Sequence, residues 1–178
     1  MNIMGQGYSL GCKKCGYNIS ANLGVGFFFP RVYEAVMEEA RNGKLGETVQ
    51  NFLTEHPDGA LDCNQVLLQC SDCGTLEPGI DLSMYLPKGN VEPRQKGIWS
   101  YAFSWEGYSY VIPSDLKGSY SLYARYDHVC KKCNGKMKII RQKDLELQER
   151  KAPDHITSNI PCPECKSLLS FEGMIMWD

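Results

Sequence analysis

Eight of the nine cysteines in this 178-residue chain are arranged as four Cys-x-x-Cys pairs. Two residues between the ligands form a tight turn that directs both thiolates at one point, so two such turns supply the four ligands of a structural zinc site. Closed sites of this kind contribute folding energy and leave no coordination position for chemistry. The spacing therefore predicts two Zn²⁺ ions per chain, with the ligands Cys12, Cys15, Cys70, Cys73, Cys130, Cys133, Cys162 and Cys165.

We predict that the four pairs combine in chain order, which gives each half of the chain a complete zinc ribbon. Sequential pairing also closes the shortest loops, although loop entropy separates the three ways of pairing by only about 1 kcal/mol. The first site would then be formed by Cys12, Cys15, Cys70 and Cys73, and the second by Cys130, Cys133, Cys162 and Cys165.

Cys63 is the one cysteine outside these pairs. A reactive thiol requires a neighbour that lowers its pKa, and no His or Lys stands beside Cys63 in the sequence. Free cysteines are more often small buried apolar residues. We therefore expect Cys63 to be buried in the core, with a reactive thiol as the alternative.

Short β-strands are expected to lead into and out of each Cys-x-x-Cys turn, and helices to fill the interval between the first two pairs. Pro30 suits a first helical turn, and apolar residues recur at helical spacing up to Ala40. A second helix is predicted over residues 47–55. The fold class expected is α+β, mainly β: two zinc-ribbon units of short antiparallel strands, the first with a two-helix insertion between its knuckles.

Residues 87–97 are polar and rich in turn formers, which indicates a domain boundary. We accordingly predict a zinc ribbon with a helical insertion at 1–86 and a linker at 87–97. An aromatic-rich β segment followed by a second zinc ribbon is predicted at 98–178.

Aromatic residues alternate along the start of this last segment, which places four rings on one face of a predicted strand. Such a face builds the core of a small β domain, and it can also stack the bases of single-stranded nucleic acid. We favour the core because the lysines nearby are diluted by acidic residues. The four residues are Trp99, Tyr101, Phe103 and Trp105.

Charge is unevenly distributed although the formal net charge is only −2. Residues 1–85 carry five Lys/Arg against ten Asp/Glu, whereas residues 86–178 carry fourteen against eleven. Because the acidic first half would repel nucleic acid, a protein partner is expected. Nucleic acid is the alternative partner, and its phosphates would be bound by Lys131, Lys132, Lys136 and Lys138.

Neither a signal peptide nor an apolar run long enough to cross a membrane is visible in the sequence. Paired cysteines without a secretion signal favour metal binding in a reducing compartment over disulfides. We expect a cytoplasmic protein with no membrane partner.

The sequence shows few of the residue patterns that enzymes use for catalysis. Its three histidines are isolated, the zinc-deaminase pattern of His-x-Glu with Pro-Cys-x-x-Cys is absent, and no nucleophile stands beside a base. The three histidines are His56, His128 and His155. We expect a non-enzymatic module.

The sequences Cys12-x-x-Cys15-Gly16-Tyr17 and Cys70-x-x-Cys73-Gly74 resemble the knuckles of rubredoxins and rubredoxin-like zinc ribbons. The two later pairs resemble an ordinary zinc ribbon. This likeness implies iron in the first site, and electron transfer, as an alternative function. Rubredoxins separate their knuckles by far less than the 54 residues found here. The Gly-Phe-Phe-Phe-Pro stretch before a helix also resembles small uncharacterised bacterial zinc-ribbon proteins.

Overall fold

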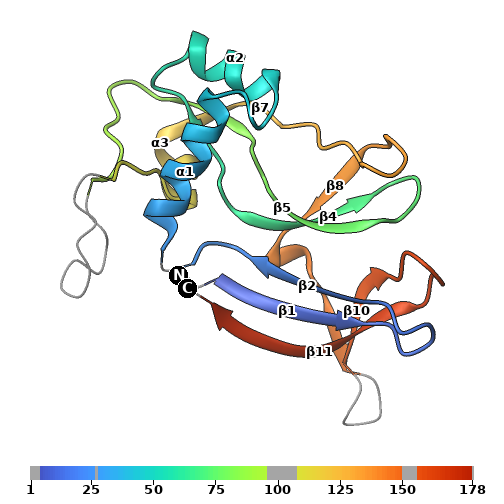
Figure 1. Ribbon diagram of the computed structural model, residues 1–178. Helices are drawn as coiled ribbons and strands as arrows, with labels where there is room; N and C mark the ends of the chain where they lie inside the picture. Colours follow the sequence, from blue (N-terminus) through green and yellow to red (C-terminus); the bar gives the residue numbers. More distant parts are fainter. Residues whose placement is uncertain (1–4, 27, 96–107, 150–155, 178) are drawn as a thin grey trace. The chain divides into compact units, whose positions relative to one another are not determined.

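The computed structural model describes residues 5–26, 28–95, 108–149 and 156–177 (Figure 1). The fold is α+β and mainly β, as predicted. The chain divides into two compact units, each assembled from separate segments. Unit 1 comprises 1–27, 65–80 and 127–178, and unit 2 comprises 28–64 and 81–126. This interleaved division differs from the consecutive segments 1–86, 87–97 and 98–178 that were expected from the sequence.

Unit 1 contains a five-stranded antiparallel sheet in which the first and last strands of the chain lie side by side. Their register pairs Gly5 with Trp177 at one end and Gly11 with Ser170 at the other. The strand order is β2-β1-β11-β10-β9. The bounds are β1 Gly5–Gly11, β2 Asn18–Leu23, β9 Leu147–Glu149, β10 Ile156–Pro161 and β11 Leu168–Trp177.

A second sheet of unit 1 repeats the strand arrangement of the first. Its order is β5-β4-β8, with β4 Gln65–Cys70, β5 Leu76–Ile80 and β8 Met137–Ile140. A single bridge from Val129 to Lys136 stands where β10 stands in the larger sheet. In both sheets, the strand entering the earlier Cys-x-x-Cys turn pairs with the strand leaving the later one.

Strand β4 contributes to two hydrophobic clusters because successive side chains of a strand point to opposite faces. Leu67 packs in the cluster formed by the five-stranded sheet, together with Leu10, Leu23 and Leu169. Its neighbours Val66 and Leu68 lie in a smaller cluster beside Cys70, Cys130 and Met137. This use of both faces explains why β4 reads as a continuous apolar run.

Unit 2 carries the helices predicted between the first two Cys-x-x-Cys turns. Helix α1 spans Phe29–Arg41 with Pro30 in its first turn, and α2 spans Glu47–Glu55. Gly43 follows α1 with a φ of 74°, a conformation that glycine adopts at little cost. The buried faces of the two helices consist of Phe29, Pro30, Tyr33, Val36, Met37, Ala40, Val49, Phe52 and Leu53.

A three-stranded sheet and a short helix complete unit 2. The strand order is β3-β6-β7, with β3 Ala60–Leu61, β6 Met84–Pro87 and β7 Tyr120–Ala124. Helix α3, Pro113–Ser119, was not predicted, and it occupies seven residues that carry Gly118 and two serines. Strand β7 follows α3 directly, at Tyr120. The aromatic row from Trp99 to Trp105 lies outside the described residues.

Candidate metal centres

The four Cys-x-x-Cys turns share one backbone geometry, which we call a knuckle and number 1 to 4 in chain order. In each knuckle the N–H of the first cysteine donates to the carbonyl five residues later, over 2.7–2.9 Å. The residue after the second cysteine donates its N–H back to the carbonyl of the first cysteine. That residue always has a positive φ, and the four are Gly16, Gly74, Asn134 and Lys166.

The knuckles combine in a nested order, not in chain order. Knuckles 1 and 4 form site A, and knuckles 2 and 3 form site B. The predicted sequential pairing is therefore wrong, although all eight predicted cysteines take part. The members are Cys12, Cys15, Cys162 and Cys165 in site A, and Cys70, Cys73, Cys130 and Cys133 in site B.

Strand pairing is the physical reason for the nested order. Strand β1 runs into knuckle 1 and pairs with β11, which leaves knuckle 4. Strand β4 runs into knuckle 2 and pairs with β8, which leaves knuckle 3. In site B the N–H of Ser71 also donates to the carbonyl of Lys136 at 2.9 Å. The β-ladders that bring the four thiols of each site together therefore join hairpins that are far apart in the sequence.

The sulfur positions in both sites fit a single tetrahedral ion. Two Sγ–Sγ distances in site A are 3.3 and 3.5 Å, and two in site B are 3.4 and 3.7 Å. Within each site all four ligand atoms lie within 4.8 Å of one another. Metal–sulfur bonds of about 2.3 Å in a tetrahedron place the sulfurs about 3.8 Å apart. Both sites are therefore able to hold a metal ion with all four thiolates as ligands.

In each site, one thiol is disposed to ionise because of a hydroxyl group two residues further on. In site B the pKa of Cys70 is lowered as well, first by a backbone hydrogen bond from Cys73. The Thr75 hydroxyl, 3.1 Å from the sulfur, and the Thr75 backbone lower the pKa of Cys73 to about 6. The Ser167 hydroxyl and backbone likewise lower the pKa of Cys165 to about 6. A hydrogen bond donated to a thiolate favours its charged form. Knuckles 2 and 4 thus favour the charged state that a metal requires of its ligands.

The knuckles opposite them lack such a hydroxyl. A backbone hydrogen bond from Tyr17 acts to lower the pKa of Cys15, but desolvation and the neighbouring cysteines outweigh it and raise this pKa to about 12. At Cys133 the backbone of Gly135 acts in the same way, and the other three cysteines of site B with desolvation raise the pKa to about 12. Four thiols this close together cannot all lose their protons unless a cation balances the negative charge of the thiolates.

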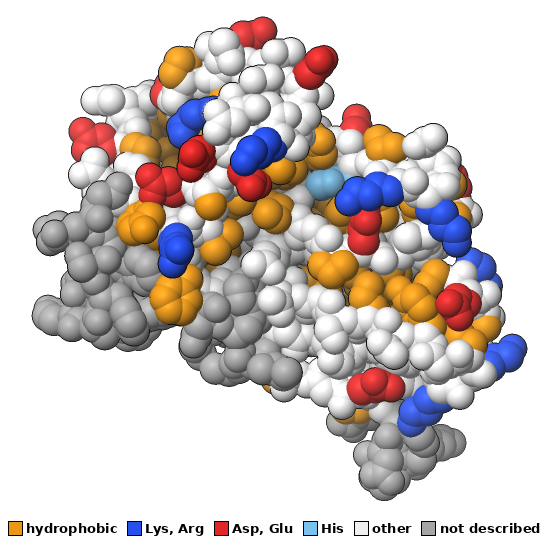
Figure 2. Space-filling view, viewed as in Figure 1, with side chains coloured by type: hydrophobic (Ala, Val, Ile, Leu, Met, Phe, Trp, Pro, Cys, Tyr) orange, Lys and Arg blue, Asp and Glu red, His pale blue; other side chains and the backbone are white. Residues whose placement is uncertain are grey.

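Lysines surround the knuckles. Figure 2 shows Lys and Arg side chains spaced along the edge of unit 1 where the knuckles end in Figure 1. Lys136, which follows knuckle 3, makes an ion pair of 2.6 Å with Asp127. The exposed lysines next to or within the knuckles are Lys13, Lys14, Lys131, Lys132, Lys136, Lys138 and Lys166.

The remaining cysteine and the histidines lie away from both sites. Cys63 is 1% exposed, and burial, followed by the charges of Asp62 and Asp81, raises its pKa well above the ordinary value. The prediction of a buried, apolar Cys63 is thus confirmed. His56 ends helix α2 and packs against the rings of Phe52 and Tyr123. His128 is buried in unit 1, and His155 lies outside the described residues.

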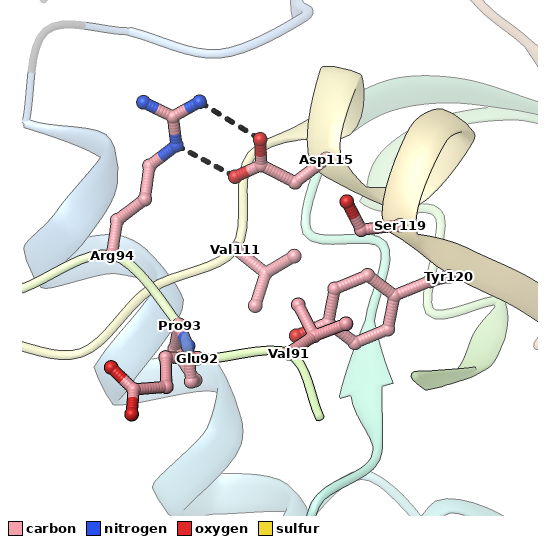
Figure 3. A pocket seen from close by; sticks show the side chains of 8 residues that line it. All are labelled: Val91, Glu92, Pro93, Arg94, Val111, Asp115, Ser119 and Tyr120. Atoms are coloured by element: carbon pink, nitrogen blue, oxygen red, sulfur yellow. Dashed lines mark hydrogen bonds and ion pairs between the residues drawn. The ribbon is translucent and has the colours of Figure 1, made fainter. Parts of the chain in front are cut away.

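A small hollow in unit 2 holds an ion pair (Figure 3). Arg94 donates to both carboxylate oxygens of Asp115 at 2.7 and 2.8 Å, and this pairing lowers the pKa of Asp115. The hollow has a volume of about 220 Å³, below the range of typical small-molecule sites. The pair ties Arg94, in the segment that was expected to be a linker, to helix α3 within unit 2. We assign it a structural role.

Comparisons of the chain with protein-family models, with curated proteins and with solved structures found no match. Among the described residues, none of the helices is both long enough and apolar enough to cross a membrane.

Proposed function

We propose that the chain is a zinc-binding, non-enzymatic module whose two four-cysteine sites hold unit 1 together. The observation that supports this most directly is the convergence of four thiols at each site in knuckles of identical backbone geometry. All-thiolate sites select soft or borderline ions, and a closed tetrahedron of four cysteines suits Zn²⁺. Because free thiols must persist until they meet the metal, a reducing compartment such as the cytoplasm is proposed with it.

Elemental analysis of the purified chain, combined with its absorption spectrum, tests this proposal. Two zinc ions per chain and no visible absorption are expected, since Zn²⁺ has a filled d shell. The Cys12→Ser and Cys70→Ser variants should each hold one ion. A chain that holds no metal when purified and binds none on addition of Zn²⁺ under reducing conditions would contradict the proposal.

Iron bound for electron transfer is the second candidate. The rubredoxin-like knuckles favour it, and each site has one solvent-exposed ligand, Cys15 in site A and Cys133 in site B. Exposure of a ligand shortens the path for an electron to an external partner. The site composed of Cys12, Cys15, Cys70 and Cys73, to which iron was assigned from the sequence, is not formed, so iron would have to occupy site A or site B. Red colour and reversible bleaching by a reductant would favour this candidate over zinc.

We further propose that the module binds another protein through the helices of unit 2. Residues 28–64 carry seven Asp/Glu against three Lys/Arg, a formal charge of −4. The outer faces of α1 and α2 expose Glu34, Glu38, Glu39, Glu47 and Glu55. A partner that docks there would have to present basic residues.

Amine-reactive cross-linking in the cell, read by mass spectrometry, separates this surface from the knuckle edge. Lys44 is exposed between α1 and α2, and cross-links from it to a basic protein are expected. These cross-links should decrease when Glu38 and Glu39 are changed to Lys. Cross-links confined to Lys13, Lys14, Lys131 and Lys132 would instead assign the interaction to unit 1.

Nucleic acid is less well supported as the partner, because the charges around the knuckles balance once the metals are counted. Within five residues of the four cysteine pairs the sequence has eight Lys/Arg and four Asp/Glu, which leaves four positive charges. Two divalent ions with four thiolates each contribute four negative charges. Binding of single-stranded oligonucleotides should therefore be weak. Submicromolar affinity that falls steeply with salt and is lost when Lys131, Lys132, Lys136 and Lys138 are changed to Glu would reverse this ranking.

A further inference from the structure

Lys166 has an unusual backbone conformation for a lysine. Its φ is 63°, in the left-handed region, at the position that glycine occupies in knuckles 1 and 2 and asparagine in knuckle 3. Residues other than glycine and asparagine adopt this conformation at a cost of roughly 1 kcal/mol or more. An interaction of the lysine side chain offsets part of this cost.

The ammonium group of Lys166 supplies that interaction by joining the two metal sites. Nζ donates to the carbonyl oxygen of Pro163, in its own knuckle, at 3.0 Å. It also donates to the carbonyl oxygen of Cys73, a ligand residue of site B, at 3.4 Å. One cation thus holds the backbone of knuckle 4 in site A to the backbone of knuckle 2 in site B.

Gly74 leaves the space that this contact needs. A Cβ atom at Gly74 would lie 3.1 Å from Nζ of Lys166 and 3.7 Å from Cα of Pro163. Gly74 also has a φ of 78°, so two separate constraints favour glycine there. The close approach of knuckles 2 and 4 is therefore built into residues on both sides of the contact.

The hydrophobic core connects the same two sites. The cluster beneath the five-stranded sheet contains two site A cysteines, Cys12 and Cys162, and also Leu67 and Leu76 from the strands flanking knuckle 2. The backbones of Gly24 and Gln65 bridge the two hairpins with two hydrogen bonds of 2.9 Å. Ordering either site therefore orders apolar surface and backbone that the other site uses.

We infer that the two sites bind metal with positive cooperativity and that the Lys166 ammonium carries a main part of this coupling, beside the shared core. This inference rests on the proposed metal binding. Filling site B fixes the Cys73 carbonyl, which positions the Lys166 ammonium and with it knuckle 4. By thermodynamic reciprocity, filling site A favours site B by the same factor. The cation also offsets the negative charge that each four-thiolate centre adds near the other.

Native mass spectrometry during a Zn²⁺ titration under reducing conditions tests the inference, because it counts chains with zero, one and two ions. The wild-type chain is expected to pass from none to two with little of the one-ion species. Coupling between sites in proteins typically spans 5-fold to 150-fold in affinity. In Lys166→Met, which keeps the stem and loses the cation, we expect this factor to fall at least about fivefold, with two ions still bound at saturation.

Two further variants separate the cation from the backbone conformation. Lys166→Gly relieves the positive-φ cost but lacks the ammonium, so its coupling should fall as in Lys166→Met. Asn134→Gly makes the equivalent backbone change in knuckle 3, where no ammonium is involved, and should keep the wild-type coupling. Full cooperativity in both Lys166 variants would overturn the role of Lys166. Independent filling of two sites in the wild type would overturn the cooperativity itself, whereas failure to bind any Zn²⁺ would overturn the proposed function.

Discussion

The Sγ atoms of Cys12 and Cys165 lie 3.3 Å apart although 153 positions separate the two residues in the chain. The site to which they belong joins the first knuckle to the last. Within it lies the second site, formed by the two knuckles in between. The metal centres are therefore nested. The two segments of unit 2 are inserted in the sequence between the three segments of unit 1.

Double substitutions distinguish nested from sequential pairing by the metal that remains. In Cys12→Ser with Cys162→Ser both changes fall in site A, so one metal ion per chain should remain in site B. In Cys12→Ser with Cys70→Ser each site loses a ligand, and no fully coordinated ion should remain. Elemental analysis of the purified variants reads this directly. Sequential pairing predicts the reverse result for the two variants.

Removal of the metal should loosen unit 1 selectively. Both sites and the strands that carry them belong to unit 1, and structural zinc sites supply roughly 10 kcal/mol or more of apparent folding free energy. A chelator is expected to increase hydrogen exchange in β1, β4, β8 and β11 together, with α1 and α2 much less affected. Faster exchange confined to residues 98–178 would instead support the consecutive division expected from the sequence.

The hydroxyl groups beside Cys73 and Cys165 should set the pH at which metal is released. Their hydrogen bonds are the largest of the interactions that lower the pKa of each thiol to about 6, so their loss raises these pKa values and lets protons displace the metal at a higher pH. A hydrogen bond to a charged group contributes about 1.5–3 kcal/mol. Divided among the several protons that replace one metal ion, this free energy corresponds to a shift of about half a pH unit. Thr75→Val and Ser167→Ala should show this upward shift in a chelator-dye titration. Thr54→Val, in α2, is the control and should leave the release curve unchanged.

The Cys63 thiol should be inert in the folded chain. Its burial raises its pKa well above the ordinary value, so it is protonated at neutral pH and shielded from reagents. Alkylation of the metal-loaded chain, read by peptide mass spectrometry, should leave Cys63 unmodified until denaturant is added. Cys63→Ala should retain both metal ions and lose only about 1 kcal/mol of stability, as expected for removal of a small buried group. Rapid labelling of Cys63 in the native chain would support the reactive-thiol alternative.

Gly59 should be intolerant of a side chain. A Cβ there would lie 2.7 Å from Cζ of Phe52 and 3.0 Å from the carbonyl oxygen of His56. Overpacking of this kind costs about 1–3 kcal/mol, so Gly59→Ala should lower the stability of unit 2 while both metal ions stay bound. The matched control is Gly118→Ala in α3, where the new Cβ would meet nothing within 4 Å. That change should be neutral or stabilise the chain by up to about 1 kcal/mol, as measured by thermal unfolding.

The features that the sequence determined are local ones. The knuckles depend on hydrogen bonds between residues four or five positions apart and on a residue that tolerates positive φ, such as Gly16 or Gly74. The helices depend on apolar residues three and four positions apart, and the bounds 47–55 expected for the second helix are those of α2. The burial of Cys63 likewise followed from the lack of any neighbour that would activate it.

The pairing of the knuckles was decided by tertiary structure. Loop entropy separates the alternatives by only about 1 kcal/mol, and the four knuckles are too alike locally to select partners. What selects them is the pairing of β1 with β11 and of β4 with β8, together with a core that Leu67 shares with Leu10 and Leu169. These contacts join residues far apart in the chain, and their energies depend on which faces are buried against each other. The same reason applies to Lys166. The sequence shows only that a lysine follows a cysteine, and the contact of this lysine with Cys73 forms only once both hairpins are in place.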